Sequence, residues 1–174
     1  MSIDNLDPAA FSPYAPRRRT VKSVAGSLSA GEMLLRRWAG CWIDLLLLGG
    51  IIVLPILFFG EATPEPVFWV AGLIILAYFP ITEGLWGRSL GKLVTGTVVL
   101  RADGAYPGIG WAIVRTLLRL IEVNPFLFGG IPAGIVLLCS SERRRLGDMA
   151  AGTYVIPVSE LKSLQPNNVE GVFD

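Results

Sequence analysis

Histidine is absent from the 174 residues of this sequence. Its absence excludes Ser-His and Cys-His catalytic pairs and every metal site that depends on histidine ligands. Cysteine is scarce, since Cys41 and Cys139 are the only two and each lies within an apolar segment. They cannot form a CxxC motif, so we expect both to be small buried hydrophobic side chains. Because no nucleophile stands beside a general base, we expect neither enzymatic activity nor a bound cofactor or metal.

Charged residues are also few, at 17% of the chain, whereas hydrophobic residues make up 52%. An ordinary soluble domain has roughly a quarter of its residues charged, and a soluble fold of this size could not bury so much apolar surface. The same composition excludes disorder for most of the chain. Lys and Arg number 15 against 14 Asp and Glu, so the net charge by itself says nothing about nucleic acid. We expect no nucleic-acid partner. The sequence predicts an integral membrane protein that is surrounded by the lipid bilayer.

Two apolar segments are each long enough to cross a bilayer, which takes about 20 helical residues. The first covers residues 38–59 with Asp44 as its single charge, and the second covers residues 67–86. Six Lys and Arg residues precede the first segment, none lie in the turn at 60–66, and three follow the second segment before residue 102. By the positive-inside rule, the N-terminus and the 87–108 loop are cytoplasmic, and the two helices form an antiparallel hairpin.

Beyond the hairpin the pattern changes to shorter elements. Residues 95–101 predict a short cytoplasmic strand, and residues 109–123 predict a helix. Residues 124–141 carry no charge but contain several Gly and Pro residues, and three arginines follow at 143–145. Either this region crosses the membrane once, which would place the three arginines outside, or two helices enter and return as a hairpin. We expect the returning pair, because it keeps the arginines cytoplasmic and protein can shield its Gly/Pro-rich middle.

Ionisable side chains inside apolar segments are the candidate functional residues, because they are costly in a membrane. Asp44 lies about 9 Å along the helix from Trp38, at about 1.5 Å per residue. Arg37 lies two turns earlier than Asp44 on nearly the same face, so the two side chains could form a pair. Gly40, one turn from Asp44 on that face, would let another helix approach closely.

The expected partner of Asp44 is the helix at 109–123. Its polar side chains recur at spacings of four and three residues and therefore share one face. Glu83, near the end of the second apolar segment, would join them in a cluster of acids and arginines. A further candidate for helix packing is the GxxxG motif of Gly130 and Gly134. The residues on the shared helix face are Trp111, Arg115, Arg119 and Glu122.

The sequence leaves three interpretations of this cluster open, and one of them is that its arginines bind lipid headgroups. It could be a titrating site for protons or monovalent cations in a transport-related protein, with carboxylates as the proton carriers because histidine is absent. It could instead be a static clasp that fixes the helices, in a membrane scaffold that docks a protein partner through residues 87–108 and 143–156. A bundle this small encloses little interior, so a transport path would need a homo-oligomer.

Four segments of the chain, at residues 36–48, 83–104, 115–126 and 143–156, together form a recognisable pattern. In this pattern the chain resembles the RDD family of bacterial membrane proteins, which is named for an arginine and two aspartates. The resemblance covers residues 34–156 and implies that the family arginine is Arg37 and the family aspartates are Asp44 and Asp148. Glu122 departs from the pattern, since an aspartate is expected there. Some members of the family have been linked to cation/proton antiport, and the resemblance implies a bacterial inner-membrane location. The segments are RRWAGCWIDLLLL at 36–48, EGLWGRSLGKLVTGTVVLRADG at 83–104, RTLLRLIEVNPF at 115–126 and RRRLGDMAAGTYVI at 143–156.

Together these features predict an all-α integral membrane protein with a small helical bundle. We expect two full transmembrane helices, a helical hairpin or third span, and a short cytoplasmic β-like segment. Residues 34–156 would form the membrane domain. Residues 1–33 would form a flexible cytoplasmic tail, and residues 157–174 a loose polar tail.

Overall fold

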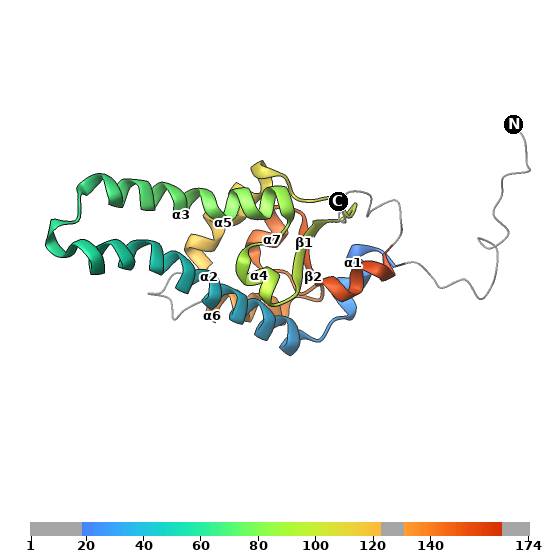
Figure 1. The fold of residues 1–174 in the computed structure, drawn as a ribbon. Coiled ribbons are helices and arrows are strands. Elements are labelled where there is room, and N and C mark those ends of the chain that lie inside the picture. The colour runs from blue at the N-terminus through green and yellow to red at the C-terminus, as the bar shows by residue number, and fades with distance from the viewer. Residues whose placement is uncertain (1–18, 123–130, 165–174) are drawn as a thin grey trace, which may run out of the picture.

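The structure is a computed structural model that describes residues 19–122 and 131–164. It is mostly helical, with a long helical hairpin that projects from a body of short helices and one small sheet (Figure 1). The hairpin consists of α2 (Ala30–Phe59) and α3 (Glu65–Trp86), joined by the short helix η3 (Gly60–Ala62). Both long helices have the length and apolar composition of membrane-spanning helices, as the two apolar segments predict.

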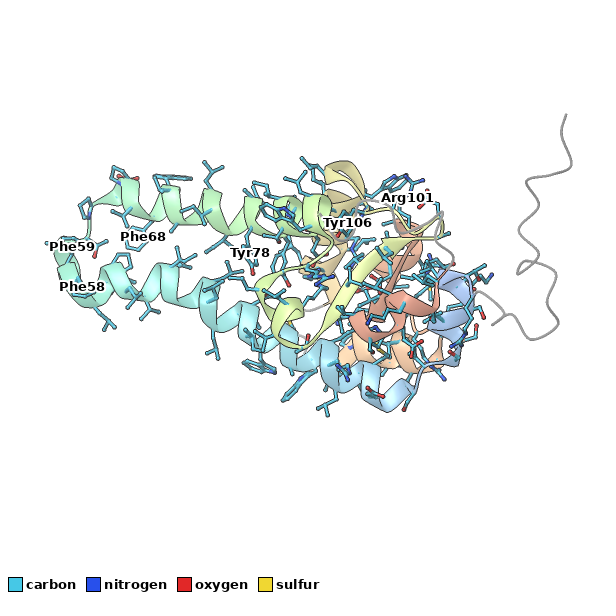
Figure 2. The ribbon with its side chains drawn as sticks, turned by 45° about the vertical axis from the view of Figure 1, so that its right-hand side comes forward. Phe58, Phe59, Phe68, Tyr78, Arg101 and Tyr106 are labelled. Carbon is cyan, nitrogen blue, oxygen red and sulfur yellow. The ribbon has the colours of Figure 1, made fainter. Side chains whose placement is uncertain are left out.

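The hairpin exposes apolar side chains and buries polar ones. In α2 the side chains of Arg37 and Asp44 are buried, whereas Leu57 and Phe58 are 73% and 82% exposed. Such an exposed apolar surface is favourable against hydrocarbon and unfavourable against water. Figure 2 shows Phe58 at the tip of the hairpin and Arg101 at the opposite end of the molecule. The hairpin tip therefore lies far from Arg101 and the end of the molecule that contains it.

Proline and glycine set the bounds of α3. Pro66 lies in the first turn of the helix, where a missing N–H costs little. Gly87 ends the helix with a φ of +64°, a left-handed conformation that glycine adopts readily. The chain then turns directly into α4 (Leu90–Val94), whose N-cap is Ser89. This tight turn brings α4 back against the hairpin.

A core of the kind found in water-soluble domains closes the end of the molecule opposite the hairpin tip. The expected strand is present as β1 (Thr97–Arg101), which pairs antiparallel with β2 (Thr153–Pro157). Helix α1 (Val21–Ser27) packs against β2, and the short helix η5 (Val158–Ser163) follows it. The sheet thus joins the segments before and after the membrane-type part of the chain. The buried core residues are Val21, Val24, Ala25, Val98, Leu100, Tyr154, Ile156, Leu161 and Leu164.

This core corrects the two predicted tails. The expected flexible tail at 1–33 contains α1 and the first turn of α2, and the expected loose tail at 157–174 contains η5. Each segment has a few apolar residues, such as Val21 and Leu161, that are buried only because the sheet lies between them. A run this short gives no periodic signal by itself. Residues 1–18 and 165–174 lie outside the described part of the chain.

Three further short helices complete the body, and two of them follow the expectation for residues 109–141. Helix α5 (Ile109–Glu122) starts beside the end of α3, where the Gly108 N–H donates to the Gly84 carbonyl at 3.1 Å. The chain leaves α6 beside the start of α2, where Arg143 Nε donates to the Leu28 carbonyl at 3.3 Å. The outer ends of this helix pair therefore lie at the body end of the hairpin, which is the geometry of a returning pair. The helices are α5 (Ile109–Glu122), α6 (Ile131–Cys139) and α7 (Leu146–Ala150).

The two cysteines differ from the expectation of burial. Cys41 is half-buried and Cys139 is exposed, and both are free thiols. Cys139 lies on an apolar helix whose outer face has no protein neighbour among the described residues, so its apolar surroundings in sequence do not bury it. The exposed apolar residues of this helix form a surface that is favourable against hydrocarbon and unfavourable against water.

Candidate functional site: a buried charge network

Glu83 is the centre of a buried charge network, and its side chain is fully buried. Lys92 Nζ of α4 donates to one carboxylate oxygen at 2.6 Å, and Arg119 Nη2 of α5 donates to the same oxygen at 2.5 Å. Arg115 Nε donates to the other oxygen at 3.2 Å. One carboxylate on α3 therefore holds α4 and α5 in place through three cations.

Asp148 is the second anion of the network. Arg37 Nη1 of α2 donates to one of its oxygens at 2.5 Å, and Arg115 Nη1 donates to the other. The Arg145 backbone N–H also donates to this carboxylate at 3.1 Å, so Asp148 caps its own helix α7. Burial alone would raise the pKa of the Asp148 carboxyl, but the guanidinium groups of Arg37 and Arg115 hold that pKa well below its usual range.

Arg115 links the two anions, because its planar guanidinium contacts Glu83 on one edge and Asp148 on another. It also donates to the hydroxyl of Thr153, the first residue of β2. The ion pairs therefore form one connected chain through α2, α7, α5, α3 and α4. Charges this deeply buried need oppositely charged partners, because desolvation is costly.

Asp44 has different partners from those expected from the sequence. Arg37 pairs with Asp148 instead, and Asp44 accepts hydrogen bonds from three neutral donors. The Tyr78 hydroxyl lies 2.8 Å away, the Ser89 hydroxyl 2.6 Å and the Gly91 N–H 2.8 Å. Because Ser89 and Gly91 form the start of α4, Asp44 caps that helix. The prediction that α5 supplies the partners of Asp44 is wrong.

The contact that Asp44 holds in place is a close crossing of α2 and α4. A Cβ atom added to Gly91 would lie 1.9 Å from the Gly40 carbonyl oxygen, and one added to Gly40 would lie 3.1 Å from the Gly91 oxygen. Glycine at both positions lets the two backbones touch. Gly40 thus makes a close helix contact as the sequence suggested, although the partner is α4. Gly134 lies against Leu34 of α2, and Gly130 lies outside the described residues.

The polar face of α5 is divided between the interior and the surface. Arg115 and Glu122 are buried, whereas Trp111 at the start of the same stripe is 47% exposed. Glu122 accepts a hydrogen bond from the Gly147 N–H at 3.3 Å and so reaches the start of α7. Glutamate at this position therefore lies against the same helix as Asp148, although the two carboxylates have different partners.

A small cavity of about 40 Å³ lies inside the network. This volume has room for about three water molecules. Its wall carries five cationic and three anionic side chains, and it includes Cys41, Phe79 and the crossing glycine Gly40. Within the described residues no group of acidic and cysteine side chains is arranged to hold a metal ion. The charged wall residues are Arg37, Asp44, Lys92, Arg115, Arg119, Glu122, Arg145 and Asp148.

Lys92 is the functional candidate that the sequence reasoning missed. Burial lowers the pKa of its ammonium group to about 8, with Arg119 and Arg115 adding to the effect and Glu83 opposing it. Lys92 follows Gly91 and precedes the apolar residues Leu93 and Val94. This sequence context gives no sign of a contact with Glu83. The nearest signal is the spacing of nine residues across a Gly-Arg-Ser turn, which allows the chain to fold back. The assumption that only carboxylates could handle protons here overlooked this lysine.

Comparison with known proteins identifies the family. The RDD family profile matches residues 31–152, a range that contains every ion pair of the network. The chain belongs to the RDD family. The chain is also similar to the uncharacterized protein YckC of Bacillus subtilis (strain 168), with 30% identity over 127 residues. That alignment covers 67% of this chain and 83% of YckC. No solved structure matches the chain.

In this RDD protein the three residues that we expect to correspond to the family name have different partners. Arg37 and Asp148 are direct partners that join α2 to α7. Asp44 belongs to the crossing of α2 with α4. The RDD motif residues therefore fix both short helices, α4 and α7, onto the first long helix.

Proposed function

We propose that this protein is a transport-related membrane protein in which protons are handled by Lys92, on the wall of the cavity, and by its carboxylate partner Glu83. The observation that supports the proposal most directly is the Lys92 ammonium group, which is only 15% exposed and lies 2.6 Å from a Glu83 carboxylate oxygen. Desolvation there lowers the pKa of Lys92 to about 8. A group that titrates close to neutral pH can take up and release protons under physiological conditions. Membership of a family of membrane-type proteins agrees with this assignment.

The surface around the network supports a location at the cytoplasmic boundary of the apolar zone of a membrane. Helices α4, α5 and α7 turn charged side chains inward and apolar side chains outward, so that an apolar surface surrounds the charges. We propose a multi-pass protein of the bacterial inner membrane with its N-terminus and sheet in the cytoplasm, because the Lys and Arg residues gather at that end. The outward apolar side chains include Leu93, Val94, Leu117, Leu120 and Leu146.

The charge of the cavity favours a proton over a monovalent metal cation. Cationic side chains outnumber anionic ones on the wall by five to three, and Glu83 is already bonded to three of the cations. An added metal cation would meet net repulsion there. Of the two kinds of ion expected from the sequence, protons and monovalent cations, the cavity wall therefore favours protons.

A path across the membrane needs more helices than the described residues supply. The outer half of the α2–α3 hairpin projects beyond the body (Figure 1). We propose that a second copy of the chain packs against this apolar hairpin, because transport requires an enclosed path. Crosslinking between exposed hairpin positions in native membranes tests this assembly. A purely monomeric protein in membranes would contradict it.

The proton proposal is tested with Lys92→Arg in proteoliposomes that contain a pH-sensitive dye. Arginine keeps the positive charge and can still contact Glu83, but it stays protonated throughout the accessible pH range. We expect proton movement by the parent to change around pH 8, and we expect this change to be absent in Lys92→Arg. Lys22→Arg is the matched control, since Lys22 is an exposed lysine that pairs with Glu142. An unchanged pH profile in Lys92→Arg would refute the proposal.

A membrane scaffold is the second candidate function, and the connected ion pairs favour it. A network that links five helices around a cavity of about 40 Å³ is also what a static clasp requires. A scaffold would dock a protein partner through the cytoplasmic segments at 87–108 and 143–156. Under this alternative no ion movement occurs at any pH, and loss of Lys92 only weakens the fold.

A further inference from the structure

The cavity contains buried guanidinium groups whose donors are not all used. Arg37 Nη1 is bonded to Asp148, but Arg37 Nε and Nη2 have no hydrogen-bond partner within the described residues. Arg119 Nη1 is also buried without a hydrogen-bond partner within the described residues, although Arg119 Nη2 contacts Glu83. Both residues line the cavity, and the Arg37 side chain is only 3% exposed. Buried charged donors without acceptors are costly, so the site requires an acceptor.

Arg145 adds a third guanidinium to the same wall. Burial together with the nearby charges of Arg37 and Arg119 lowers the pKa of Arg145 to about 10. The three cations therefore lie close enough to repel one another. The nearby anions relieve this excess only in part, because Asp148 is shared with Arg37 and Arg115 and Glu83 is bonded to Lys92, Arg115 and Arg119. Glu122 and Asp148 attract the Arg145 guanidinium, but the wall still carries five cationic side chains against three anionic ones.

We propose that the cavity binds a phosphate-type oxyanion through Arg37, Arg119 and Arg145. Guanidinium forks match the several oxygens of a phosphate group, and charge-assisted hydrogen bonds to them are strong. Water molecules would satisfy the donors but would leave the repulsion between the cations. The oxyanion is either free phosphate or the phosphate of a lipid headgroup, because the cavity lies at the body end of the hairpin. The inference rests on the proposed function, since it names a ligand class for the same cavity.

The size of the cavity limits what enters it. A volume of about 40 Å³ accepts one oxyanion group and excludes a bulky organic body. A larger phosphate ester would therefore insert only its phosphate and leave the remainder outside. Leu117, Leu120 and Leu146 are exposed on α5 and α7, the helices that carry Arg119 and Asp148, and an apolar surface of this kind would suit the acyl part of a lipid.

The test measures the thermal unfolding of the full-length protein in a neutral detergent. Inorganic phosphate is compared with sodium chloride at equal ionic strength, because a ligand that binds the folded state raises its melting temperature. In a second arm, nanodiscs of phosphatidylcholine are compared with nanodiscs that also contain phosphatidic acid. We expect phosphate, phosphatidic acid or both to raise the melting temperature of the parent.

Arg145→Gln is the main variant, because it removes a cavity cation and keeps the backbone N–H that caps Asp148. We expect it to weaken phosphate binding at least tenfold, while Arg101→Gln on the exposed end of β1 binds like the parent. If Arg145→Gln fails to fold, Arg119→Lys replaces it, since lysine keeps the charge opposite Glu83 but loses the fork. A response to phosphate alone assigns the site to the free ion, and a response to phosphatidic acid alone assigns it to a headgroup.

Two outcomes would overturn the proposal: no specific stabilisation in either arm, or equal stabilisation of Arg145→Gln and the parent. Binding is measured without any ion movement. A negative result here therefore leaves the proton proposal intact, and a failed flux assay leaves this proposal intact.

Discussion

At the scale of single residues, the two motif aspartates differ in the charge of their partners. Asp148 is bonded to two guanidinium groups, whereas Asp44 is bonded to two hydroxyls and one backbone N–H. A carboxylate that loses its charge beside buried cations leaves those cations uncompensated. A carboxylate that loses its charge among neutral donors leaves at most a hydrogen bond unsatisfied. Asp148 and Asp44 therefore differ in the free energy that is lost when each carboxylate is neutralised.

This difference predicts unequal costs for the two neutral substitutions. Asp148→Asn should lower the free energy of unfolding by about 3–5 kcal/mol, because it breaks a buried ion pair. Asp44→Asn should cost about 1–3 kcal/mol, because one donor loses its acceptor. Denaturation of the purified variants in the same detergent measures both values. A larger loss for Asp44→Asn than for Asp148→Asn would contradict the assignment of partners.

Lys92 predicts a stability that depends on pH. Its pKa is about 8 in the folded protein against an ordinary value of 10.5, so the unfolded chain binds more protons between these limits. The free energy of unfolding should therefore rise with pH from about 8 to about 10.5, and this contribution should be constant below pH 8. Comparison with Lys92→Arg isolates the effect, since arginine does not titrate in this range. Parallel pH curves for parent and variant would show that Lys92 has an ordinary pKa.

At the scale of elements, the position of α4 depends on one backbone crossing. Its five residues are too few to form a stable helix alone. Asp44 caps its first turn, Glu83 holds Lys92, and Gly91 touches the carbonyl of Gly40. The crossing therefore places the titrating lysine at the cavity.

Gly91→Ala tests this crossing. The added methyl group would lie 1.9 Å from the Gly40 carbonyl oxygen, and a backbone atom cannot move aside as a side chain can. We expect a loss of about 1–3 kcal/mol or more in the free energy of unfolding. Gly49→Ala is the matched control in α2, because nothing lies within 4 Å of its added methyl group. Equal stability of the two variants would refute the close contact.

The sequence predicts the elements better than it predicts their contacts. Apolar length and basic flanks are sufficient to predict the hairpin, and charges in apolar segments identify Arg37, Asp44 and Glu83 as buried residues. The partner of Arg37 could not be predicted, because Asp148 is 111 residues away in sequence and reaches it only after α7 folds back onto α2. Lys92 was missed because nothing local distinguishes a buried lysine from an exposed one. Pairing in the network depends on tertiary geometry, which residue spacing does not encode.

At the scale of the whole molecule, two kinds of interior meet at the charge network. The sheet end buries apolar side chains as a water-soluble domain does, whereas the hairpin exposes them. Helices α4, α5 and α7, which carry much of the network, lie between the outer half of the hairpin and the sheet (Figure 1). A boundary between water and hydrocarbon at this level would place the cavity where the cytoplasm can reach it.

The orientation of the molecule is tested with single cysteines in a background without Cys41 and Cys139. Ala62→Cys at the exposed hairpin tip should react with an impermeant thiol reagent added to intact cells. Ser23→Cys on the exposed face of α1 should react only after the membrane is permeabilised. Labelling in the reverse order would mean that the basic end faces outward.

The most direct test of the account uses the native Cys41, which lines the cavity. In a Cys139→Ser variant reconstituted in lipid vesicles, a small water-soluble thiol reagent reports whether water reaches the charge network. We predict that Cys41 reacts in the folded protein, because the charged wall surrounds a cavity that water can enter. If Cys41 reacted only after unfolding in sodium dodecyl sulfate, the network would be a dry clasp and the proton-handling account would be contradicted.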